Sequence, residues 1–289
     1  MDDMNATRRQ FFASTAALLG GSGLASAKTL KVIGVQLYTL RSVIDAKPLE
    51  ILQALQKLGY SEVEVIRANM DKIWPSLKQT SLKPVSLHVD TQYFTKEQDK
   101  LQATFEDAKQ KGFQWMVCPY IAPADRGGAD MIKRLADTLN KAGERTHKLG
   151  MNLAYHNHAF EFAPAGEGGG TLLDILMKET DPKLVALELD IMWSTVAGVD
   201  PVSVLQKYKG RIALMHVKDV EKGTAQRYNE QVPKSAFKEA GRGMVDLAAV
   251  LRAASAEGVK HYFVEQDQVP GDPLESLKIS YEYLHKLNF

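Results

Sequence analysis

Histidine and carboxylate side chains gather at the end of one apolar run, Met151–Phe162, which reads MNLAYHNHAFEF. If this run is a β-strand, successive side chains point to opposite faces, so His156 and His158 project to the same side. Glu161 follows shortly after them in the sequence. Imidazoles and carboxylates bind divalent metal ions and act as general acids and bases. The run therefore predicts a site for metal or proton-transfer chemistry.

Three later apolar runs end in the same way. The run VALELD ends at Asp190, the run IALMHVKD contains His216 and Lys218, and the run YFVEQD contains Glu265. Four such endings in succession indicate a site that is assembled from the ends of neighbouring strands.

Eight short apolar runs alternate with amphipathic stretches from Lys31 onward. Nearly continuous apolar character is typical of parallel strands that are covered on both faces. The expected strands are Val32–Leu40, Glu62–Ile66, Pro84–Val89, Trp115–Ile121, Met151–Asn157, Val185–Ile191, Arg211–Lys218 and His261–Gln266. The expected helices are Pro48–Leu58, Glu97–Lys111, Ala129–Leu149, Thr171–Glu179, Pro201–Tyr208, Val245–Glu257 and Pro273–Leu287.

This alternation predicts an α/β fold, a (β/α)8 TIM barrel in a single domain over residues 28–289. A doubly wound sheet would typically carry fewer strands and a glycine-rich turn after the first strand. The sequence contains no G-x-G-x-x-G and no G-x-x-x-x-G-K-[ST] motif, which leaves dinucleotide and P-loop sites without support. In such a barrel, chemistry takes place at the carboxyl ends of the strands, where the polar residues of this chain fall.

The charge and cysteine content exclude several classes of partner and site. A net charge of +1 gives no global field for nucleic acid, so we expect no nucleic-acid partner. The single cysteine, Cys118, has no second cysteine with which to form a disulfide or a thiolate metal site.

The first 27 residues have the order of an export signal. Arg8 and Arg9 form a pair that resembles a twin-arginine motif, and a weakly apolar stretch and an A-x-A site at Ala25–Ala27 follow. That stretch is interrupted by glycine and shorter than the ~20 apolar residues of a membrane span. We therefore expect residues 1–27 to be a signal peptide read by the Tat export machinery, and the mature protein to be periplasmic without a membrane anchor.

The order YHNHxxEF, ELDxxW, HVKD and VEQD resembles the xylose-isomerase-like TIM-barrel superfamily of sugar and sugar-phosphate isomerases and epimerases, specifically its exported YHNH-type branch. The resemblance covers Leu30–Phe289. It implies one divalent ion, manganese, cobalt, zinc or magnesium, held by a Glu, an Asp, a His and a Glu. The last three ligands match Asp190, His216 and Glu265.

The first ligand is either Glu161 or His156, because relatives often carry a glutamate where this chain has His156. We expect Glu161 to be this ligand, since it supplies an anionic oxygen. Either Glu161 or Glu265 would move the proton, with His158 beside substrate oxygens and Lys218 next to a developing oxyanion. The alternative for Lys218 is a structural ion pair with a nearby acid. Further substrate contacts are expected from His88, His156, Gln36 and Trp193.

The resemblance implies a metal-dependent isomerase or epimerase that acts on a keto-sugar or related small carbohydrate through an enediolate-type proton transfer. The same intermediate permits β-elimination, so a lyase or hydrolase of 3-keto-glycosides is the alternative. A non-catalytic carbohydrate-binding barrel is the alternative of another class. Cleavage of abasic DNA, also found in the superfamily, is disfavoured by the near-neutral charge. The sequence leaves the particular sugar and the oligomeric state open.

Overall fold

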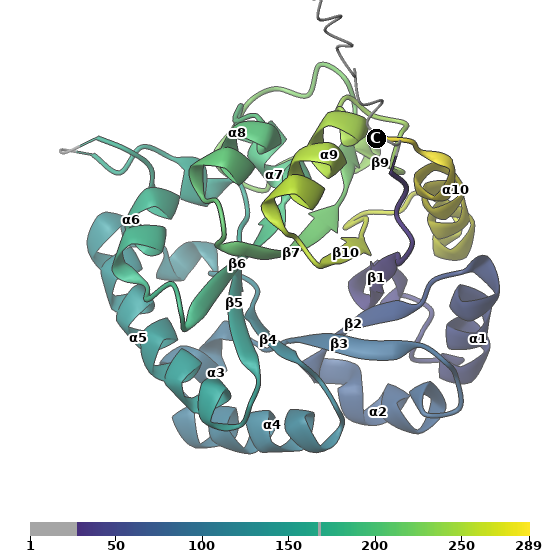
Figure 1. The fold of residues 1–289 in the computed structure, drawn as a ribbon, viewed down its shortest axis with the longest axis horizontal. Coiled ribbons are helices and arrows are strands. Elements are labelled where there is room, and N and C mark those ends of the chain that lie inside the picture. The colour runs from purple at the N-terminus through teal and green to yellow at the C-terminus, as the bar shows by residue number, and fades with distance from the viewer. Residues whose placement is uncertain (1–27, 167–168) are drawn as a thin grey trace, which may run out of the picture.

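The computed structural model describes residues 28–166 and 169–289, and the expected signal segment, residues 1–27, lies outside them. Eight parallel strands close into a barrel in the order β1-β10-β7-β6-β5-β4-β3-β2, and helices surround it (Figure 1). The strands are β1 (Gly34–Gln36), β2 (Glu62–Ile66), β3 (Lys83–His88), β4 (Trp115–Cys118), β5 (Asn152–His156), β6 (Val185–Asp190), β7 (Ile212–Val217) and β10 (His261–Val264). The expected single-domain (β/α)8 barrel is confirmed.

All the expected helices are present, with ends shifted by a few residues at most. They are α1 (Pro48–Leu58), α4 (Gln98–Gln110), α5 (Gly128–Lys148), α6 (Leu172–Glu179), α8 (Pro201–Lys207), α9 (Leu247–Glu257) and α10 (Pro273–Lys286). Three helices were not expected: α2 (Arg67–Leu77), α3 (Thr91–Thr95) and α7 (Ile191–Val196). Within the described residues, no helix combines the length and apolar character needed to cross a membrane.

Several strands are shorter than the sequence predicted; the fourth, expected to reach Ile121, ends at Cys118. At two other strand ends, side chains cap the backbone. The first strand stops at Gln36, whose Oε1 accepts a hydrogen bond from the backbone N–H of Tyr38 at 3.0 Å and starts a 3-10 turn. The sixth strand stops at Asp190, whose Oδ1 accepts from Trp193 N at 2.9 Å. Ile191, expected at the end of the strand, therefore begins α7 instead.

A layer of apolar side chains fills the barrel beneath the polar strand ends. Ala154, Leu214 and Phe263 belong to this buried layer. Each lies two residues before a polar strand-end residue on the same strand, so it shares that residue's inward face. An added Cβ at Gly34 would lie 2.5 Å from Phe263 Cδ1, so only glycine leaves room for this ring.

The connection after β7 carries a small second sheet that was not expected. Its strands are β8 (Asp219–Val220) and β9 (Phe237–Lys238), which pair in antiparallel fashion. The Asp219 carboxylate accepts hydrogen bonds from the backbone N–H groups of Gly241 and Gly243 at 3.0 and 2.9 Å. This anchored connection brings Glu230 and Phe237 to the pocket at the barrel mouth.

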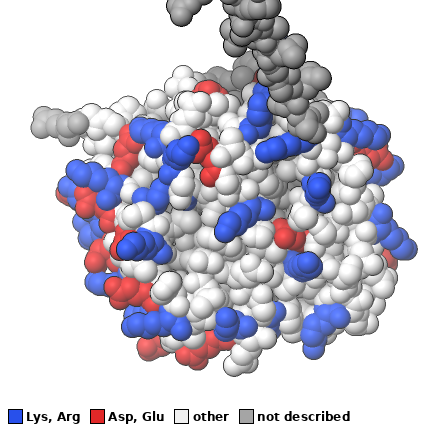
Figure 2. Space-filling view, in the orientation of Figure 1, with Lys and Arg blue, Asp and Glu red and all other residues white. Residues whose placement is uncertain are grey.

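Charge is mixed on the face drawn in Figure 2. Lysine and arginine side chains stand beside aspartate and glutamate around the rim of this face, so it presents no single basic field.

Gly143 in α5 tests how tightly this helix packs on the segment before β6. An added Cβ would lie 2.7 Å from the backbone oxygen of Leu184. Gly143→Ala is therefore expected to lower the free energy of unfolding by about 1–3 kcal/mol, the usual cost of overpacking. At an open helical position the same change would raise stability by up to about 1 kcal/mol. Urea unfolding shows whether the free energy of unfolding falls or rises. An unchanged or higher value would show that the segment at Leu184 can move to accept the added methyl group.

Candidate active site at the carboxyl ends of the strands

A pocket of about 480 Å³ opens at the carboxyl ends of the strands. Its lining includes His88, His156, Lys218 and Glu265, which come from four different strands or strand ends. The volume lies in the range of about 300–1,000 Å³ that is typical of small-molecule sites. The site is therefore assembled from separate strands at one mouth of the barrel.

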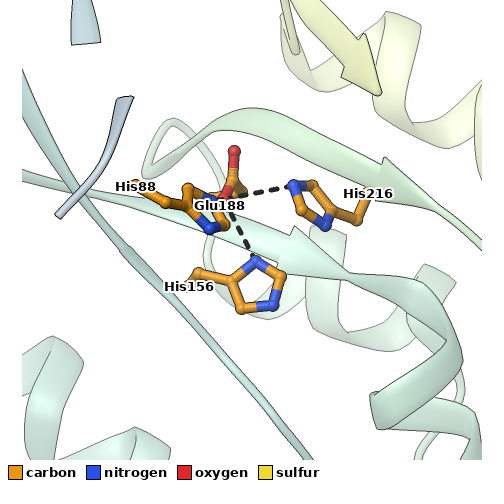
Figure 3. A group of neighbouring side chains, drawn as sticks. All are labelled: His88, His156, Glu188 and His216. Carbon is orange, nitrogen blue, oxygen red and sulfur yellow. Dashed lines mark hydrogen bonds and ion pairs between the residues drawn. The ribbon is translucent and has the colours of Figure 1, made fainter. Parts of the chain in front are cut away.

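Glu188 lies at the centre of a buried group with three histidines (Figure 3). Its Oε2 lies 2.9 Å from His88 Nε2, 3.1 Å from His156 Nδ1 and 3.4 Å from His216 Nε2. Its Oε1 is also buried and has no hydrogen-bond partner among the described residues. Burial, followed by the charge of Glu64, raises the pKa of Glu188 to about 7.

Glu64 fixes the orientation of two of these histidines. Its Oε1 lies 2.6 Å from His216 Nε2 and 2.8 Å from His88 Nε2. Gln36 Nε2 donates to the same oxygen at 2.8 Å, and the Ser86 hydroxyl donates to Oε2. Burial raises the pKa of Glu64, but His88 and His216 lower it further, so the net pKa is well below the usual value. Glu64 is thus an anion that accepts the Nε2–H of His216.

A second group joins Asp190, His216 and Glu265, whose ligand atoms lie within 4.8 Å of one another. His216 Nδ1 is 2.8 Å from Glu265 Oε2. The structure thus brings together the three residues that the family motifs match to the second, third and fourth metal ligands. Burial lowers the pKa of His216, but Glu188, Glu265 and Glu64 raise it well above the usual value, so both ring nitrogens carry protons and donate to carboxylates; a metal ion at Nδ1 would replace the proton that faces Glu265.

Lys218 places an ammonium ion among the carboxylates of this group. Its Nζ lies 2.8 Å from Asp190 Oδ2, contacts Glu265 Oε2, and lies 3.0 Å from Asp267 Oδ1. Burial lowers the pKa of Lys218, but the three carboxylates raise it well above its usual value. The oxygens that would face a metal ion are therefore already arranged around a positive charge.

Glu161 does not join these groups, contrary to the expectation from sequence. Its Oε1 accepts a hydrogen bond from the Tyr155 hydroxyl at 2.6 Å, and its Oε2 accepts from the backbone N–H of His158 at 2.9 Å. Tyr155 points to the face of β5 opposite to His156, so the turn after β5 carries Glu161 away from the barrel mouth. Burial raises the pKa of Glu161 to about 8.

His156, the alternative first ligand, lies beside Asp190. Its Nδ1 faces Glu188, and its Nε2 lies 3.7 Å from Asp190 Oδ2. Burial, followed by the charge of His216, lowers the pKa of His156 well below the usual value, so the imidazole is neutral. With Nδ1–H donated to Glu188, the Nε2 lone pair is free to bind a cation beside Asp190.

The remaining expected substrate residues divide into two sets. His88, His158 and Trp193 line the pocket, and the His158 ring stands between Tyr120 and Trp193 at centroid distances of 5.0 and 5.5 Å. Gln36 is fully buried and bonds Glu64, so it supports the site from below instead of lining the pocket. Sequence reasoning missed Tyr120, Glu230 and Phe237. Tyr120 lies beyond the end of β4, in a segment that was expected to continue the strand, and the other two lie in the connection after β7, where no element was expected.

The donor set fits a divalent metal ion. Carboxylate and imidazole ligands without thiolate suit ions such as manganese, cobalt or zinc. Metal-binding histidines usually donate their second N–H to a carboxylate, as His216 does to Glu64 and His156 does to Glu188. The buried cluster can therefore hold a metal ion.

Residues 34–286 match the sequence profile of the family described as xylose isomerase-like TIM barrel. The match spans most of the chain, so the chain belongs to this family. It confirms the superfamily that the strand-end motifs indicated.

Several individual proteins are similar to this chain in sequence or in fold. The chain is 34% identical over 164 residues to inosose dehydratase from Geobacillus thermodenitrificans (strain NG80-2), and the match covers 53% of each protein, so it spans about half the length of that relative. Among solved structures, the IOLI protein with a bound zinc atom superposes with a TM-score of 0.67 at 18% identity, covering 87% of this chain and 95% of that one. The 3-keto-D-glucoside 4-epimerase from E. coli gives 0.65 at 16% identity, covering 90% and 100%. These two similarities concern the fold.

Proposed function

We propose that this protein is a divalent-metal-dependent isomerase or epimerase that moves a proton next to the carbonyl of a keto-sugar or related carbohydrate. The observation that carries the proposal is the buried group of Asp190, His216 and Glu265, in which Lys218 pairs with Asp190 and Glu265; Lys218 and Glu265 also line the pocket. Buried carboxylates are costly unless they are paired or bind a metal. This group has the composition and burial of a site for a cation and an oxygen-rich ligand.

We infer that Asp190, His216, Glu265 and His156 would hold the ion. When bound, the ion would polarise a carbonyl oxygen and make the neighbouring C–H more acidic. Two carboxylates would balance the charge of a divalent ion, and two imidazoles would complete a four-ligand set. Glu64 and Glu188 would orient the two histidines from behind.

The chain supplies a base and a counter-charge around the reacting carbon. Glu265 lines the pocket and is our candidate base; burial raises its pKa, but Lys218 and His216 lower it further to below the usual value, so the carboxylate is ionised and only weakly basic while both partners contact it. Lys218 would stabilise negative charge that develops on the substrate oxygen. His158, whose pKa is lowered by burial and by Lys218, would contact substrate hydroxyls as a neutral imidazole.

The runner-up function is β-elimination from a 3-keto-glycoside at the same site. One relative is named a dehydratase and one structural neighbour a 3-keto-glucoside epimerase. Both names are compatible with removal of a proton next to a carbonyl, which is the first step of epimerisation and of β-elimination. They therefore support this step without favouring one of the two reactions. A non-catalytic carbohydrate-binding barrel is the alternative of another class.

Proton exchange with solvent separates these functions. The protein loaded with manganese is incubated in D₂O with a 3-keto-glucoside, and NMR follows the proton next to the carbonyl. We expect that proton to be replaced by deuterium, and the exchange to stop when a chelator removes the metal. An epimer as product supports the leading proposal, and a released aglycone supports elimination. Binding of the keto-sugar with no exchange would support the non-catalytic alternative.

Glu161→Gln is expected to leave the metal content unchanged, because both Glu161 oxygens are engaged by Tyr155 and His158. Burial raises the pKa of Glu161 from 4.5 to about 8. Between pH 4.5 and about pH 8, the Glu161 carboxyl is protonated in the folded protein but ionised in the unfolded chain. Protonated Glu161 therefore contributes fully to the free energy of unfolding below pH 4.5, and this contribution is lost as the pH rises toward about 8. A carboxamide has the donor and acceptor of a protonated carboxyl, so the variant should lose this pH dependence. Urea unfolding at about pH 5 and pH 8 measures it.

His156→Ala is the paired test of the first ligand. Loss of an outer partner of a metal ligand already weakens metal binding by about 10–100-fold, so loss of the Nε2 lone pair should cost at least as much. Metal affinity is measured by competition with a chromophoric chelator. If the His156→Ala variant keeps its metal ion and the Glu161→Gln variant loses it, Glu161 is the first metal ligand instead of His156.

We also propose that the chain is exported through the Tat machinery to the periplasm. The support is the order of Arg8 and Arg9, an apolar stretch and the site at Ala25–Ala27. Replacing both arginines by lysine should keep the precursor in the cytoplasm, as fractionation would show. An unchanged periplasmic yield would contradict the proposal.

A further inference from the structure

The pocket has two chemically different parts. Lys218, Glu265 and Asp267 line the part above β7 and β10. The part above β1, β2 and β4 is lined by apolar and aromatic side chains, which we call the apolar wall: Tyr38, Ile66, Ala68, Pro119 and Tyr120. A sugar needs hydrogen-bonding partners around its ring, which the first part offers in charged side chains, whereas the apolar wall offers only the two tyrosine hydroxyls.

The two tyrosines of the apolar wall are unusually exposed for such large side chains. Tyr38 is 38% exposed and Tyr120 is 36% exposed, while most large apolar side chains of the described residues are buried. Both stand at the rim of the same pocket. Exposed aromatic groups that share one pocket are typical of a ligand surface, whereas a single exposed one needs no explanation.

An arginine holds the Tyr38 ring in place. The Arg41 Cζ lies 4.0 Å from the centroid of this ring. Arg41 is itself fixed, because its Nη1 donates to the backbone oxygen of Tyr38 at 2.9 Å and its Nη2 donates to that of Asp267 at 2.6 Å. A ring that is already ordered loses little conformational entropy when a ligand stacks on it.

Tyr120 is supported in a similar way by Arg126. The Arg126 Cζ lies 3.8 Å from the centroid of the Phe160 ring and 5.3 Å from that of Tyr120. Its guanidinium forms two hydrogen bonds with the Glu230 carboxylate, at 2.9 and 3.0 Å. Three loops thus meet at this arginine, and both rim tyrosines are preorganised.

The pocket has room for more than the polar group of a ligand. Its volume of about 480 Å³ lies within the range of about 300–1,000 Å³ for pockets that enclose drug-sized ligands. His88 and Asp90, from the end of β3 between β2 and β4, also line the pocket and interrupt the apolar wall; His88 Nε2 faces Glu64 and Glu188, and Asp90 Oδ1 accepts from the Gln92 backbone N–H at 2.9 Å. Apart from these two residues, the aromatic and aliphatic side chains of the apolar wall offer contacts to a planar apolar group attached to the sugar.

We propose that the apolar wall is a second subsite, which binds an aromatic substituent of the substrate through the Tyr38 and Tyr120 rings. The ligand class is an aryl glycoside, with its sugar ring over Lys218 and Glu265 and its aryl group between the tyrosines. This inference rests on the proposed function only for the placement of the sugar. Two aromatic contacts should together strengthen binding about tenfold.

Calorimetric titration with two matched glycosides tests the subsite. Phenyl β-D-glucoside and methyl β-D-glucoside share the sugar and differ only in the substituent. The manganese-loaded protein is expected to bind the phenyl glucoside about tenfold more tightly. In the double variant Tyr38→Ala, Tyr120→Ala this preference should vanish while the affinity for the methyl glucoside stays the same. Tyr283→Ala is the control, because Tyr283 is 37% exposed on α10, outside the pocket lining.

Three results would overturn the subsite: no saturable binding of phenyl glucoside, equal affinities for both glucosides, or a preference that survives the double substitution. If the double variant melts at a lower temperature, Tyr38→Leu and Tyr120→Leu keep apolar bulk and remove only the ring. Because binding is measured without turnover, the two proposals can fail separately. A phenyl preference without deuterium exchange would contradict the proposed function alone, and exchange without a phenyl preference would contradict the subsite alone.

Discussion

Replacement of Asp190 by asparagine is expected to empty the metal site and to lower turnover by at least about 100-fold, the smaller cost of removing one preorganised catalytic group. Asp190 Oδ2 lies 2.8 Å from the Lys218 ammonium and is one of two anionic oxygens in the proposed ligand set. Asp190 Oδ1 separately caps α7 through Trp193 N. Asparagine caps helices about as well as aspartate, so the fold should survive the change.

Asp200→Asn is the matched control for this variant. Asp200 caps α8 by accepting from Val202 N at 3.0 Å, and the bond is exposed. The same chemical change outside the pocket should leave metal content and turnover intact. Elemental analysis and the deuterium-exchange rate are compared for the two variants. Full metal and full activity in Asp190→Asn would show that this carboxylate is not a ligand.

Lys218→Met is expected to destabilise the metal-free protein by about 3–5 kcal/mol, the cost of removing one partner from a buried ion pair. Lys218 is 2% exposed, and its loss leaves the carboxylates of Asp190, Glu265 and Asp267 without their ammonium partner. A bound divalent ion would supply positive charge to the same carboxylates. Manganese should therefore recover a large part of the lost stability, as measured by urea unfolding with and without a chelator.

Lys141→Met gives the reference for this measurement. Lys141 pairs with Asp137 on the surface of α5, where both side chains are 65% exposed. Exposed pairs contribute little, so this variant should stay within about 0.5 kcal/mol of the parent. If Lys218→Met loses the same stability with and without manganese, the ion and the ammonium do not share one set of carboxylates.

The barrel was predictable because its elements carry local signals. Helix α1, for example, begins at Pro48 and ends before Gly59, whose φ of 108° only glycine adopts readily, so its ends coincide with the sequence prediction. Helix α7 was missed because its first three residues, Ile191–Trp193, are apolar and continue the pattern of the strand before it. The cap that separates the two elements is Asp190, whose effect on the backbone depends on a side-chain rotamer that no periodicity reveals.

The site was partly predictable for the same reason. The alternation of side chains along strands places Asp190, His216 and Glu265 on inward faces, and closure of the barrel brings them together. Glu161 lies beyond the end of β5, where alternation no longer applies, and the turn returns it to the Tyr155 face. The central place of Glu188 depends on how the strands are staggered in the barrel, which sequence does not give.

Location of the ion in a crystal grown with manganese tests the central claim most directly. An anomalous difference map is expected to show one peak per chain in direct contact with Asp190, Glu265, His216 Nδ1 and His156 Nε2, with Lys218 displaced toward Asp267. Metal–ligand distances should be about 2.0–2.3 Å. A peak on Glu161, or no peak at the barrel mouth of a protein that still exchanges the substrate proton, would contradict the account.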